Sequence, residues 1–108
     1  MDLEVLKQAI NTYGEFNQMN MAIEEMSELT KAICKLRRAS DELRNANFMF
    51  EKLKIIAVER KNIVEEMADC LIMLEQLKMI FNCEDEVNEQ IDFKINRLKE
   101  RLNNERLS

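Results

Sequence analysis

The stretch IVEEMADCLIMLEQLKMIF, residues 63–81, decides the fold that the sequence predicts. Its apolar residues recur at alternating steps of four and three positions, which places them on one face of an α-helix. These residues are Ile63, Met67, Cys70, Leu74, Leu77 and Phe81. The pattern predicts a helix over roughly residues 59–81.

The same spacing occurs on both sides of this stretch. Apolar residues follow it from Met19 to Leu36, which predicts a second long helix. It returns over residues 87–102, which predicts a C-terminal helix. Asp85 or Glu86 is expected near the start of that helix, because anions are favoured at the positive end of the helix dipole.

The remaining segments give a shorter helix and one irregular region. Apolar spacing over residues 3–13 predicts a short helix that ends at Gly14, the only glycine. Residues 39–58 place apolar side chains on too many faces for one stripe. There we expect an N-cap at Ser40 or Asp41, followed by a short helix or a connecting loop.

Composition bounds the class of protein. The chain of 108 residues has no proline and one glycine, so it lacks the turn residues of a sheet protein. We expect one all-α domain over residues 1–108, an antiparallel bundle of about four helices. The chain shows no signal sequence, no apolar run long enough to cross a membrane and no paired cysteine motif. These features predict a soluble, cytoplasmic protein that does not bind membranes.

Two acidic motifs accompany the long stripes. They are EEMSE, residues 24–28, and EEMAD, residues 65–69. Each of four acids directly precedes a stripe residue, so the acids share the edge of the apolar face. These acids are Glu25, Glu28, Glu66 and Asp69. If the two helices pack side by side, the carboxylates converge on a cation, whereas a solvated acidic ridge is the ordinary alternative.

The chain contains no histidine, so it lacks the Glu-x-x-His pattern of di-iron bundles and is a poor candidate for zinc. An all-carboxylate site favours Mg²⁺, with Mn²⁺ as a substitute, and Mg²⁺ leaves coordination positions for phosphates. On the C-terminal helix the corresponding flank is basic, with Lys94 and Arg97. These two side chains are candidates for phosphate binding. The net charge of −5 opposes nucleic-acid binding, and the lone glycine excludes a P-loop.

The motifs EEMSEL and EEMADCLIMLEQL, with the closing IDFKINRLKERL, resemble the MazG-like, all-α nucleoside triphosphate pyrophosphohydrolase superfamily. The resemblance covers about residues 10–102. It implies that Glu25, Glu28, Glu66 and Asp69 bind Mg²⁺ and act in catalysis, and that Lys94 and Arg97 contact phosphate. It further implies a role for Gln18 at the sugar or base, and a homodimer or tetramer.

The function implied is Mg²⁺-dependent hydrolysis of a nucleoside triphosphate to a monophosphate and pyrophosphate. Two alternatives stay open. One is a non-enzymatic helical interaction module, in which the acidic and basic flanks pair with each other. The other keeps the superfamily but takes phosphoribosyl-ATP or a modified nucleotide as substrate.

Overall fold

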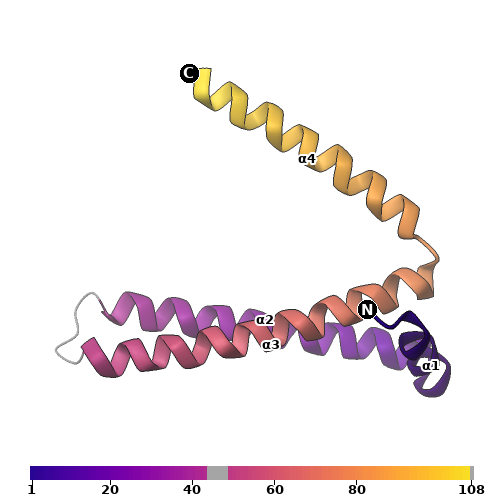
Figure 1. The fold of residues 1–108 in the computed structure, drawn as a ribbon, viewed down its shortest axis with the longest axis horizontal. Helices are drawn as coiled ribbons and strands as arrows, with labels where there is room; N and C mark the ends of the chain where they lie inside the picture. Colours follow the sequence, from indigo (N-terminus) through magenta and orange to yellow (C-terminus); the bar gives the residue numbers. More distant parts are fainter. Residues whose placement is uncertain (44–48, 108) are drawn as a thin grey trace. The chain divides into compact units, whose positions relative to one another are not determined.

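The computed structural model describes residues 1–43 and 49–107, which form four α-helices and no strand (Figure 1). The helices are α1 (Leu3–Tyr13), α2 (Glu15–Leu43), α3 (Met49–Phe81) and α4 (Glu84–Leu107). The predicted all-α helical fold is therefore confirmed. None of these helices combines the length and apolar character needed to span a lipid bilayer.

The described residues fall into two compact units. The first, Met1–Leu77, holds α1, α2 and most of α3, and the second begins at Lys78 and holds the last turn of α3 together with α4. A single domain over residues 1–108 stays a prediction.

Local signals set both ends of α1. The Asp2 side chain caps its start by accepting a hydrogen bond from the Val5 backbone N–H at 3.3 Å. Gly14 ends the helix with φ of 93°, and its N–H donates to the Ile10 carbonyl at 2.8 Å. This left-handed conformation is strained for residues with a Cβ, which is why the predicted stop at glycine is correct.

Helices α2 and α3 lie side by side and antiparallel (Figure 1). Two side-chain pairs connect them at distant levels. The Gln18 amide donates to Gln76 at 2.7 Å, and Lys52 binds Glu42. From the first pair to the second, the chain advances along α2 by as many residues as it goes back along α3. The two helices therefore keep one alignment over their whole contact.

The two helices meet along one narrow band, which we call the seam. On α2 the buried and half-buried seam residues are Gln18, Ala22, Glu25, Leu29, Ala32, Leu36 and Ala39. On α3 they are Ile56, Glu59, Ile63, Glu66, Cys70, Met73 and Leu77. Both series alternate steps of four and three, the spacing of helices that pack lengthwise. Three small alanines on α2 allow the helix axes to approach closely.

The seam differs from the predicted stripes by a small rotation. Met26 and Ile33 of the predicted stripe on α2 are 38% and 42% exposed, and Met67 on α3 is 49% exposed. Glu25 and Glu66, one position earlier than the two methionines, are half-buried instead. Apolar residues cover two adjacent faces of each helix, and only one of these faces can pack in the hairpin.

The interpretation of residues 39–58 is wrong where the structure describes them. Ser40 and Asp41 cap no helix, because α2 continues through them to Leu43. Residues 49–58 are the first turns of α3, and residues 44–48 lie outside the described part. Ser40 and Asp41 are exposed, so their polar side chains are compatible with a helical surface.

Helix α3 ends at a left-handed asparagine. Asn82 has φ of 48°, and the Cys83 N–H donates to the Lys78 carbonyl at 3.1 Å. This hydrogen-bond pattern is a Schellman cap, in which asparagine substitutes for the usual glycine. Helix α4 begins directly afterwards with acids in its first turn, as the sequence predicts.

Candidate metal centre

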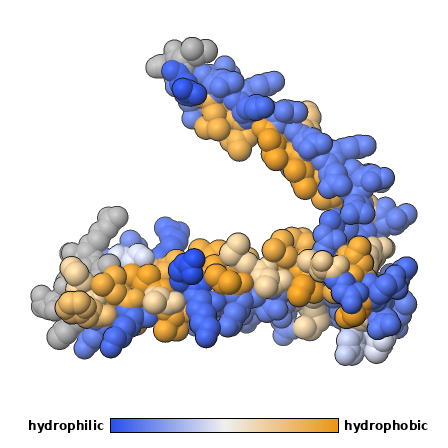
Figure 2. Space-filling view, in the orientation of Figure 1, coloured by the Kyte–Doolittle hydropathy of each residue, from blue (hydrophilic) through white to orange (hydrophobic). Residues whose placement is uncertain are grey.

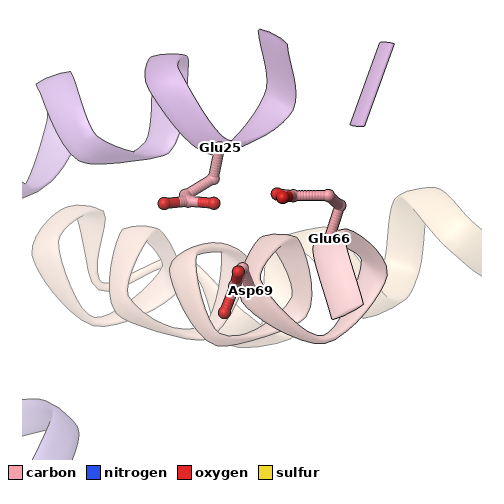
Figure 3. Close-up of side chains that lie close together, drawn as sticks. All are labelled: Glu25, Glu66 and Asp69. Carbon is pink, nitrogen blue, oxygen red and sulfur yellow. The ribbon is translucent and has the colours of Figure 1, made fainter. Parts of the chain in front are cut away.

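Three of the four predicted carboxylates gather at one level of the hairpin. Glu25 on α2 and Glu66 and Asp69 on α3 each offer an oxygen atom, and these atoms all lie within 4.8 Å of one another. Figure 3 shows Glu25 pointing from α2 toward α3, with Glu66 reaching into the space between the two helices. We call these three residues the acidic cluster.

The register of the hairpin explains this convergence. The Gln18–Gln76 pair fixes the alignment, and two helical turns further along α2 the same alignment places Glu25 opposite Asp69. Glu66 lies on the same side of α3 as Asp69, because residues three apart are neighbours on a helix. Glu25 and Glu66 are half-buried and Asp69 is exposed, so the cluster extends from the seam to the surface.

Burial and the repulsion between neighbouring carboxylates both affect the acidic cluster. The pKa of Glu25 is raised above its ordinary value of 4.5, first by burial and then by the charge of Asp69. Hydrogen bonding with Glu66 raises it further. The Oε2 atom of Glu66 is buried and has no hydrogen-bond partner among the described residues. An ionised carboxylate only accepts hydrogen bonds, so Glu25 and Glu66 bond to each other only when one of them carries a proton.

Glu28 lies outside the cluster. The register of the hairpin places it at the level of Glu66, but it is exposed and its carboxylate lies 3.6 Å from the Lys31 Nζ atom. Exposed ion pairs of this kind contribute little to stability, so rotation of the Glu28 side chain would cost little. Its role as a metal ligand stays a prediction.

Cys70 packs beneath the cluster. Its thiol is buried and donates to the Glu25 backbone carbonyl at 3.3 Å. Burial raises the pKa of the Cys70 thiol, and the nearby Glu25 carboxylate raises it further. The thiol is free, in agreement with its interpretation as a small apolar residue. The hydrogen bond ties the backbone of Glu25 to α3 and so helps to position the cluster.

The structure assigns Gln18 a partner that the sequence analysis missed. Gln18 and Gln76 are 6% and 4% exposed, and their amides bond directly to each other. Gln18 also lines a surface pocket together with Tyr13, Asn17, Asn20 and Met21. A correct antiparallel register would have revealed Gln76, because that register pairs the two glutamines.

Lys94 and Arg97, the predicted phosphate-binding residues, belong to α4 in the second unit. Both are exposed, and the Arg97 guanidinium lies 5.9 Å from the centroid of the Phe93 ring. At this distance the cation interacts favourably with the ring face. Their contact with phosphate stays a prediction.

No protein-family description, curated protein or solved structure matches this chain.

Proposed function

We propose that Glu25, Glu66 and Asp69 bind a divalent cation, Mg²⁺ or in its place Mn²⁺, and that the protein hydrolyses nucleoside triphosphates. The supporting observation is the half-buried Glu66, whose Oε2 atom has no partner while two further carboxylates lie close by. Burying ionised carboxylates without a counter-charge costs several kcal/mol. A divalent cation would remove that penalty.

The donor set fits a hard cation. All three candidate ligands are carboxylates, the chain has no histidine, and the neighbouring Cys70 thiol is held protonated by burial. Oxygen ligands suit Mg²⁺ and Mn²⁺, whereas zinc favours imidazole and thiolate. When bound, such a cation screens phosphate charge and lowers the pKa of water.

Nucleoside triphosphates are the proposed substrates because the two acidic motifs and the closing basic motif resemble the MazG-like superfamily. In the proposed reaction a water oxygen bonds to the α-phosphorus. The bond from that phosphorus to the bridging oxygen breaks, and pyrophosphate leaves with the electron pair. A carboxylate of the cluster accepts a proton of the water.

We further propose that the protein acts as a homodimer or tetramer. The supporting observation is an exposed apolar face on the hairpin beside the seam, and Figure 2 shows orange apolar patches along α2 and α3. Exposed side chains of this face are Met26, Ile33, Met67, Leu71 and Leu74. Neighbouring exposed apolar side chains of this kind often mark a protein interface. We also propose a cytoplasmic location. The net charge of −5 opposes binding to nucleic acid.

The test is product analysis of the purified chain with a panel of ribo- and deoxyribonucleoside triphosphates, phosphoribosyl-ATP and modified nucleotides. We expect a monophosphate and pyrophosphate from at least one compound with Mg²⁺ or Mn²⁺ present, and no products after chelation. The best substrate decides between the common nucleotides and phosphoribosyl-ATP. If no compound releases pyrophosphate, the enzymatic proposal is wrong, and the interaction module becomes the better interpretation.

A further inference from the structure

Helix α4 carries an apolar stripe that nothing in its own unit covers. Ile91, Ile95, Leu98 and Leu102 follow steps of four, three and four, and each is about half exposed, between 47% and 56%. Figure 2 shows the apolar residues running along one side of the helix. Among the described residues of its unit, α4 is accompanied only by the last turn of α3. The stripe therefore needs a partner from elsewhere.

The charges beside this stripe have a defined order. Asp85, Asp92, Lys99 and Arg106 lie one heptad apart, so all four line the same flank. Two acids come first and two bases follow. Charged residues at this position in a heptad pattern determine the partner and the direction of a paired helix.

We propose that α4 pairs antiparallel with α4 of a second copy of this chain. In that arrangement Asp85 lies beside Arg106 of the copy and Asp92 beside Lys99, and two-fold symmetry repeats both pairs. The stripes also match, because Ile91 lies at the level of Leu102 and Ile95 at the level of Leu98. The second copy thus supplies both the apolar cover and the opposite charges.

The opposite flank supports the antiparallel direction. In an antiparallel pair Lys94 faces Arg101 of the copy, which is one repulsive contact repeated by symmetry. In a parallel pair Lys94 would face Lys99, and Arg101 would face Arg106. A parallel pair would thus have two different repulsive contacts between bases, each repeated by symmetry. A parallel pair would also leave Asp85 and Asp92 without a base opposite.

The test is a charge exchange in the full-length chain, with association measured by sedimentation equilibrium. Asp85→Lys/Asp92→Lys makes the flank fully basic, and Lys99→Asp/Arg106→Asp makes it fully acidic. We expect each variant to self-associate at least about tenfold more weakly than the wild type. An equimolar mixture should restore association, because every flanking pair then joins opposite charges.

Two further variants show whether weaker association results from lost charge pairs between the copies or from disruption of α4 itself. The chain with all four exchanges keeps acids opposite bases and should associate like the wild type, although Asp85 is one of the three anions in the first turn of α4. Glu89→Lys/Glu100→Lys changes the net charge as much as Asp85→Lys/Asp92→Lys does, on the face away from the stripe. This control should associate like the wild type.

Several results would overturn the proposal. One is a wild-type chain that stays monomeric up to about 500 μM, well above the usual range of specific association. Another is a mixture that associates no better than its two components. Stronger association of Lys99→Asp/Arg106→Asp would indicate a parallel pair. Because the readout is association, the result is independent of whether the protein hydrolyses nucleotides.

Discussion

Two of the polar layers in the seam differ in whether their side chains can satisfy one another's hydrogen bonds. At one level Gln18 and Gln76 are both buried and share a hydrogen bond of 2.7 Å. Two helical turns further along α2, Glu25 meets Glu66 and Asp69, and the Glu66 Oε2 atom has no partner. Amides both donate and accept, whereas ionised carboxylates only accept.

We interpret the difference as that between a pair that sets the register and a site that needs a ligand, and the predicted role of Gln18 at the sugar or base stays a prediction. A buried amide pair specifies the register of a helical hairpin and needs nothing from outside the protein. A cluster of carboxylates in the same seam raises the pKa of Glu25 and stays incomplete without a proton or a cation. Substitutions in the acidic cluster should therefore affect ligand binding, and substitutions in the glutamine layer should affect folding.

The largest expected effect is on hydrolysis. Glu66→Gln should lower the rate of pyrophosphate release by at least about a hundredfold, because it removes a proposed ligand while keeping the shape of the side chain. Glu51→Gln makes the same charge change on the exposed first turn of α3 and should leave the rate unchanged. Equal rates for Glu66→Gln and the wild type would remove this residue from the site.

The next effect concerns stability. Saturating Mg²⁺ should raise the melting temperature of the wild type by several degrees, since a ligand at a hundred times its Kd contributes about 2.7 kcal/mol. Glu25→Gln should lose most of this increase. Without the cation the same variant should melt higher than the wild type, because it relieves repulsion at the cluster. Calorimetry with matched KCl controls measures both effects, and a Mg²⁺ response equal in the two proteins would contradict the proposed site.

The glutamine layer should behave differently. Gln76→Leu leaves the Gln18 amide buried without its partner and should cost about 1–3 kcal/mol of unfolding free energy. The double variant Gln18→Leu/Gln76→Leu should recover most of that loss. Urea denaturation with and without Mg²⁺ tests the comparison, and the Mg²⁺ response of Gln76→Leu should remain. A double variant no more stable than the single one would show that the amide bond is not the reason for the loss.

The smallest effect is on the pH dependence. The pKa of Glu25 is higher in the folded protein than its ordinary value of 4.5, so the folded state binds this proton more tightly than the unfolded state. Without metal, stability should therefore rise as the pH falls through the raised pKa toward 4.5, and Glu25→Gln should lack this rise. Melting curves between neutral pH and pH 4.5 compare the two proteins. Parallel curves would place Glu25 in an ordinary solvated environment.

Much of the fold could be predicted from the sequence because its signals are local. The short helix ends at Gly14 and α4 begins among acids, and both boundaries depend on residues close in the chain. The long helices were recognised by their apolar spacing. The N-cap expected at Ser40 or Asp41 was wrong because the same residue types also occur on exposed helical surfaces.

Only part of the candidate site could be predicted from the sequence. Motif spacing brought together Glu25, Glu66 and Asp69, which the structure places within reach of one another. It did not distinguish Glu28, because the direction of an exposed side chain depends on a neighbour such as Lys31. The sequence placed Glu25 and Glu66 at the edge of the apolar face, whereas the structure places them half-buried within the seam. Spacing alone cannot tell which of two adjacent apolar faces will pack.

Titration with Mn²⁺ shows whether a divalent cation completes the acidic cluster. Electron paramagnetic resonance measures the free Mn²⁺ in the presence of the wild type, Glu66→Gln and Gln76→Leu. We expect saturable binding to the wild type that Mg²⁺ displaces, unchanged binding to Gln76→Leu, and at least about tenfold weaker binding to Glu66→Gln. Equal affinity of the wild type and Glu66→Gln, or no binding to the wild type at millimolar Mn²⁺, would show that the acidic cluster is not a cation site.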